Sequence, residues 1–199
     1  MNNSKANNNS ILNLTLRLVI ITLCAGLILG FVYAITKDPI EQQQIKKATE
    51  ARQMVLPDAA DFEEIALTGI DYDEATYGII QAVYKGTKDG QVAGYTFDIV
   101  TKGYKPGLSL TVGIAADGKV TGVEIGTHEE TPGLGANATN PDFLGQFVGK
   151  DGPIAVVKTP SGAENEVQAL TGATLTSKGV ANAVNTARDF MTKYLVEGA

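Results

Sequence analysis

Four hydroxyl side chains and a glycine lie together in Thr171-Gly172-Ala173-Thr174-Leu175-Thr176-Ser177. The residues just before this stretch, Glu166 to Leu170, alternate between polar and apolar and predict the end of a strand. The residues after it, 177–195, predict a helix, because their apolar side chains recur three and four positions apart. The stretch is therefore expected to be a strand-to-helix turn.

The chemistry of this turn allows two interpretations. Small residues let a ligand approach the backbone closely. The free N–H groups and the positive dipole end of the next helix favour a phosphate. Ser and Thr are also common helix N-caps, and Thr176 and Ser177 are well placed for that role. The residues alone leave a phosphate site and a plain helix cap open.

A second motif runs from Gly126 to Gly135 and reads Gly-Thr-His-Glu-Glu-Thr-Pro-Gly-Leu-Gly. Its Pro-Gly pair is a turn signal. A histidine, two acids and a threonine before that pair are unusual in a plain connection. A solvated surface loop is an equally good interpretation of the residues alone.

Both motifs resemble the FMN-binding domain family. This family includes the G subunit of the Rnf electron-transport complex and the C subunit of the sodium-pumping NADH:quinone reductase. Thr171-Gly172-Ala173-Thr174 is similar to the family's flavinylation motif, and His128 to Gly135 is similar to a run found in the Rnf protein. The segments Gly103 to Gly107 and Val112 to Ile114 also resemble the family's sheet. Gln168 stands where the flavinylation motif usually has an acidic residue.

The resemblance implies that Thr174 carries FMN through a phosphoester bond formed by a flavin transferase. Glu130 and Thr131, with the backbone from Gly133 to Gly135, would form a polar wall for the isoalloxazine ring. His128 is either a ligand contact or a structural histidine. The implied cofactor-binding residues are Thr171, Gly172, Ala173, Thr174, Leu175, Thr176, Ser177, His128, Glu130, Thr131, Gly133 and Leu134.

An uncharged apolar run from Leu18 to Ile35 predicts a transmembrane helix in the lipid bilayer. With Ile11 to Leu16 in front, it supplies the ~20 residues that cross a bilayer. A cleaved signal peptide is the alternative, but the run exceeds the ~7–15 residues of a signal core. Basic residues flank the run on both sides and do not determine its orientation. The resemblance implies a single pass through the inner membrane, with the domain on the extracytoplasmic side.

The whole chain predicts an α+β protein with one N-terminal transmembrane helix, followed by an FMN-binding domain with an antiparallel sheet and flanking helices. Asp-Gly pairs at 89–90 and 117–118 predict two hairpins. Asp38-Pro39 predicts a new helix start after the anchor. The expected divisions are a disordered N-terminus (1–10), the anchor (11–36), a connector helix (37–57) and the domain (58–199).

Composition narrows the possible functions. The 199 residues include one cysteine and one histidine, so we expect no metal site of the zinc or iron–sulfur type. From Lys37 onward the chain holds all 22 acidic residues and 14 of the 16 basic ones, a net charge of −8 that argues against nucleic acid. A dinucleotide fingerprint and a nucleophile elbow are both missing from the sequence.

Together with the resemblance, these features imply an electron-carrier subunit without catalytic residues of its own. It would hold covalent FMN and exchange electrons with other subunits of an Rnf-type complex, which couples ferredoxin:NAD electron transfer to sodium or proton translocation. One alternative is the C subunit of the sodium-translocating NADH:quinone reductase. Another is a membrane-anchored, non-redox module that binds a phosphate or a glycan.

Overall fold

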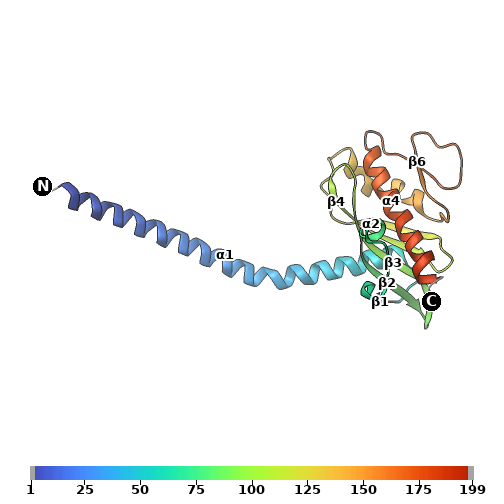
Figure 1. Cartoon of the computed structure of the whole chain (residues 1–199), viewed down its shortest axis with the longest axis horizontal. Coiled ribbons are helices and arrows are strands. Elements are labelled where there is room, and N and C mark those ends of the chain that lie inside the picture. The colour runs from blue at the N-terminus through green and yellow to red at the C-terminus, as the bar shows by residue number, and fades with distance from the viewer. Residues whose placement is uncertain (1–2, 197–199) are drawn as a thin grey trace. The chain divides into compact units, whose positions relative to one another are not determined.

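A single helix, α1 (Asn3–Val55), begins the chain. The computed structural model describes residues 3–196, with the backbone alone at residues 3–10, 41 and 69. It separates into two units, one up to Ala48 and one from Thr49 onward. All the strands lie in the second unit (Figure 1).

The first unit is the membrane-anchor candidate. Among the described residues, α1 is the one helix that is long and apolar enough to cross a membrane. Large apolar side chains such as Leu12, Leu29 and Phe31 are exposed along it. Apolar side chains all around a helix are typical of a membrane span.

The helix is longer than the sequence predicts. It continues through Pro39, where the expected connector would start, although proline removes one backbone hydrogen bond there. The expected disorder at residues 1–10 falls partly outside the described residues, and the helix already begins at Asn3.

Five antiparallel strands form the main sheet, each paired with the next along the chain. They are β1 (Asp61–Ile65), β2 (Ile80–Lys88), β3 (Gln91–Lys102), β4 (Pro106–Ala115) and β5 (Val120–Ile125). The two hairpins predicted from the Asp-Gly pairs are confirmed as β2–β3 and β4–β5. Both Asp89 and Gly90 have a positive φ, as the tightest hairpin turns require. The edge strand β1 is not among the strands expected from the sequence.

The remaining elements are short, apart from the last helix. They are η1 (Leu67–Gly69), α2 (Glu74–Tyr77), η2 (Gly135–Thr139), α3 (Pro141–Leu144), η3 (Gly145–Phe147), β6 (Ala155–Val157) and β7 (Glu166–Gln168). Strands β6 and β7 form a small parallel pair. The chain then enters α4 (Thr174–Phe190), which continues as a π-helical segment, Met191–Val196.

Helix α4 covers one face of the main sheet, in contact with β3 and β4 (Figure 1). Its fully buried side chains Val180, Val184 and Ala187 recur at helical spacing and join the core. Phe190 packs edge-on against Phe97 of β3, with ring centroids 6.3 Å apart. Nearer the start of α4, a Cβ at Gly179 would lie 2.5 Å from the Lys102 carbonyl oxygen, so this part of the helix lies beside the end of β3.

The last residues of α1 cover the opposite face of the same sheet. Val55 packs on glycines of the sheet, where there is no room for a side chain. A Cβ at Gly122 would lie 2.8 Å from the Val55 Cα. Arg52 forms an ion pair with Asp98 at 2.6 Å and lies over the Tyr84 ring. The end of the expected connector is therefore part of the folded domain.

Candidate functional site

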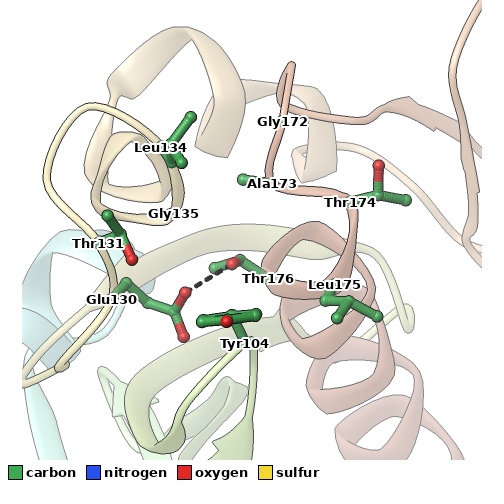
Figure 2. A pocket seen from close by; sticks show the side chains of 10 residues that line it. All are labelled: Tyr104, Glu130, Thr131, Leu134, Gly135, Gly172, Ala173, Thr174, Leu175 and Thr176. Atoms are coloured by element: carbon green, nitrogen blue, oxygen red, sulfur yellow. Dashed lines mark hydrogen bonds between the residues drawn. The ribbon is translucent and has the colours of Figure 1, made fainter.

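A cavity of about 490 Å³ lies where three segments of the domain meet. The segments are the β3–β4 turn, the loop after β5 and the start of α4 (Figure 2). The lining residues are Tyr104, Glu130, Thr131, Leu134, Gly135, Gly172, Ala173, Thr174, Leu175 and Thr176. The volume is in the range of small-molecule sites. The fold thus brings both sequence motifs to one cavity.

The turn before α4 depends on a glycine. The Ala173 N–H donates to the Leu170 carbonyl at 3.0 Å, and Gly172 between them has a φ of 74°. This is the third position of a turn that favours glycine. A Cβ at Gly172 would also come within 3.0 Å of the Leu134 side chain. Glycine therefore lets the turn and the loop approach each other.

Helix α4 begins at Thr174, three residues before the predicted start, and Ala173 is its N-cap. The predicted capping roles of Thr176 and Ser177 are wrong, because both lie inside the first turns. The Ser177 hydroxyl accepts from the Leu170 N–H and donates to the Ala173 carbonyl, both at 3.0 Å. The Thr176 hydroxyl donates to Glu130 at 2.7 Å. Two of the four hydroxyls are thus occupied, Ser177 by backbone groups of the preceding turn and Thr176 by a side chain distant in sequence.

The other two hydroxyls differ in position. Thr171 is exposed and does not line the cavity, whereas Thr174 is half-buried and lines it. Within the described residues, the Thr174 side chain makes no hydrogen bond. It is the first residue of α4, where the backbone N–H groups ahead of the helical ladder are free for a ligand. Thr174 is therefore the hydroxyl best placed to carry a phosphate.

Glu130 joins the three segments. Its side chain is buried, with 5% of the residue exposed. One carboxylate oxygen accepts from the Lys105 N–H at 3.0 Å, and the other accepts from the Thr176 hydroxyl (Figure 2). A Cβ at Gly103 would lie 2.5 Å from the first oxygen, and one at Gly135 would collide with the second. Glycines on two segments therefore leave room for this carboxylate.

The loop after Glu130 forms the turn that the Pro-Gly pair predicts. The Leu134 N–H donates to the Thr131 carbonyl at 3.1 Å, and Gly133 has a φ of 77°. In Figure 2, Thr131 and Leu134 stand across the cavity from Thr174 and Leu175. The side chains of Tyr104 and Leu175 are exposed, at 63% and 58%. Apolar groups thus rim a cavity whose inner wall is polar.

Only some of the cofactor-binding residues predicted from the sequence line the cavity. Thr171, Ser177, Gly133 and His128 do not line the cavity. The Nδ1 atom of His128 is buried and has no hydrogen-bond partner within the described part of the chain. Tyr104 lines the cavity but is missing from the predicted contacts. The one signal for it in the sequence is an aromatic residue placed between the glycines at 103 and 107.

Comparison with known proteins gives both a domain and a set of relatives. A family model described as "FMN-binding domain" matches residues 103–189, which include every cavity-lining residue. The chain is 38% identical over 184 residues to the G subunit of the Na(+)-translocating ferredoxin:NAD(+) oxidoreductase complex of Acetobacterium woodii, covering 88% of each chain. It is 35% identical to the G subunit of the proton-translocating ferredoxin:NAD(+) oxidoreductase complex of Clostridium ljungdahlii, covering 94% of each. It is 36% identical to the G subunit of the ion-translocating oxidoreductase complex of Methanosarcina acetivorans, covering 87% of this chain and 90% of the relative.

Solved structures with the same fold have lower sequence identity. NqrC of Shewanella oneidensis superposes with a TM-score of 0.58 at 21% identity. The superposition covers 78% of this chain and 100% of NqrC. The C subunit of the Na(+)-translocating NADH-quinone reductase of Parabacteroides distasonis gives a TM-score of 0.57 at 22% identity, covering 77% and 95%. These two structural similarities establish the fold of the domain.

Proposed function

Since the chain belongs to the G-subunit family of ion-translocating oxidoreductase complexes, we propose that it is the FMN-carrying electron-transfer subunit of an Rnf-type complex. Two of its relatives are subunits of complexes that couple ferredoxin:NAD(+) electron transfer to the movement of sodium ions or protons. The observation that carries the proposal is the cavity with the Thr174 hydroxyl at the start of α4. The protein passes electrons to neighbouring subunits and turns over no substrate of its own.

The cavity residues fit FMN by their chemistry. FMN attached to Thr174 through its phosphate would place that phosphate at the start of α4, where free N–H groups and the helix dipole favour an anion. The apolar rim of Tyr104, Leu134 and Leu175 suits a flat ring system. Thr131 offers a hydroxyl to the polar edge of that ring. FMN supplies the redox chemistry, while the protein holds and orients it.

The membrane topology belongs to the same proposal. We infer that Leu18–Ile35 crosses the inner membrane once and that the domain faces away from the cytoplasm. The exposed apolar side chains of this segment support its contact with lipid. Outside the cytoplasm, lost FMN has no cytoplasmic pool to replace it, which favours a covalent bond made by a flavin transferase. Other subunits of the complex are the electron donor and acceptor.

The two alternatives have less support. The C subunit of the sodium-translocating NADH:quinone reductase shares the fold, but at 21–22% identity against 35–38% for the three G-subunit relatives named above. A non-redox phosphate- or glycan-binding module is disfavoured by the match to an FMN-binding domain.

Flavin fluorescence of the denatured chain tests the proposal. The full-length protein, co-expressed with a flavin transferase, should fluoresce under ultraviolet light in a denaturing gel. Replacing Thr174 by alanine should abolish the signal, whereas the same change at the exposed Thr159, outside the motif, should keep it. A wild-type chain without fluorescence under these conditions would refute covalent attachment.

A further inference from the structure

The carboxylate of Glu130 is buried in the wall of the cavity without a cation beside it. Its two hydrogen-bond donors, the Lys105 backbone N–H and the Thr176 hydroxyl, are both uncharged. Within the described part of the chain, no ion pair involves Glu130. Both carboxylate oxygens have a hydrogen-bond partner, and Glu130 carries one of the formal negative charges that the sequence has at pH 7. The cavity wall therefore contains a negative charge that hydrogen bonds stabilise but do not neutralise.

Joining the three segments does not require this charge. A glutamine at position 130 has nearly the same shape. Its amide oxygen can accept from the Lys105 N–H, and its amide nitrogen can donate to the Thr176 oxygen. A buried charge costs more free energy than a buried amide. The charge is therefore expected to act on whatever occupies the cavity.

We propose that the buried carboxylate of Glu130 lowers the reduction potential of the flavin bound in this cavity. The inference rests on the proposed function, because it needs FMN in the cavity. An electron delivered by a reductant adds negative charge beside the carboxylate, unless a proton from water accompanies it. Repulsion between like charges is strong in surroundings of low dielectric constant. Glu130 thereby makes the cofactor a stronger electron donor.

The test compares two neighbouring acids in the full-length, flavin-loaded protein. Dithionite titration with an absorbance readout measures the midpoint potential of the wild type, Glu130→Gln and Glu129→Gln. Glu129 does not line the cavity, so its variant controls for the overall loss of one charge. Glu130→Gln should shift the potential to more positive values, and Glu129→Gln should leave it unchanged.

A second pair of variants separates charge from shape. Glu130→Asp and Glu130→Asn have the same shorter side chain and differ in charge. The aspartate variant should keep a potential near that of the wild type, although it loses stability. The asparagine variant should shift the potential in the positive direction. This pair decides the matter if Glu130→Gln does not fold.

The outcomes distinguish the inference from the proposed function. Loaded Gln and Asn variants with the wild-type potential would overturn the inference alone. An aspartate variant that shifts as far as the asparagine variant would reduce Glu130 to a structural role. A wild-type chain that carries no flavin would instead overturn the proposed function, and the inference with it.

Discussion

Hydroxyl side chains only a few residues apart have different partners at the start of α4. Ser177 ties the turn to the helix, and Thr176 ties the helix to Glu130. Thr174 lines the cavity without such a partner among the described residues. Sequence reasoning singles out Thr174 through the motif, but it assigns Thr176 and Ser177 to caps. The partner of Thr176 lies in a segment that local sequence cannot place, whereas the partners of Ser177 lie in the turn just before the helix.

Thr131 offers the first test at this scale. Its side chain is exposed in the cavity wall and is available to the edge of the ring. Thr131→Val keeps the shape and removes the hydroxyl, so we expect a shifted flavin absorption spectrum or reduction potential with attachment intact. The expected size is that of one hydrogen bond, roughly 0.5–1.5 kcal/mol. Identical spectra and potentials in variant and wild type would exclude Thr131 from the flavin contacts.

Gln168 tests what the modifying enzyme requires. The residue is exposed on β7, and its backbone N–H donates to the Gln146 side chain at 2.7 Å. Replacing this side chain by aspartate leaves that backbone bond in place. We expect Gln168→Asp to keep or raise the fraction of flavin-loaded chain, measured by the ratio of flavin to protein absorbance. A loss of loading would show that an acidic residue is unfavourable here.

Elements built from neighbouring residues were predicted best. The β2–β3 and β4–β5 hairpins follow from Asp-Gly turns, whose signal lies within the turn itself. Strand β1 and the packing of α1 on the sheet were not predicted, because both depend on partners distant in sequence. Tyr104 was missed for the same reason, since only the folded loop brings Glu130 and Leu134 to the same cavity.

The contact between α1 and the sheet can be tested with one added methyl group. In Gly122→Ala the Cβ would lie 2.8 Å from the Val55 Cα and 3.1 Å from the Val55 carbonyl oxygen. Overpacking of this kind typically costs about 1–3 kcal/mol. Gly145→Ala is the matched control, because its φ is −60° and no atom lies within 4 Å of the added carbon. Denaturant titration should show a lower free energy of unfolding for Gly122→Ala alone, and equal stability would contradict the packing.

At the scale of the whole molecule, a membrane-anchor candidate precedes an acidic domain. Apolar composition predicts the anchor directly, and the structure has one helix of suitable length and composition among its described residues. The side of the membrane was not predictable from charge, because basic residues flank the span on both sides.

A fusion at the C-terminus tests the orientation. If the domain lies outside the cytoplasm, a reporter that is active only in the cytoplasm should be silent when fused there. A reporter active only outside should be active at the same position. The reverse pattern would place the domain in the cytoplasm and remove the reason given for a tethered cofactor.

The central claim is that Thr174 carries FMN. Peptide mass spectrometry of the protein, purified after co-expression with a flavin transferase, measures this most directly. We predict that the added mass of FMN, less one water, lies on Thr174 in the peptide that spans residues 159–178, and that Thr174→Ala removes it. The same mass found on Thr171 or Thr176, or retained in Thr174→Ala, would contradict the account.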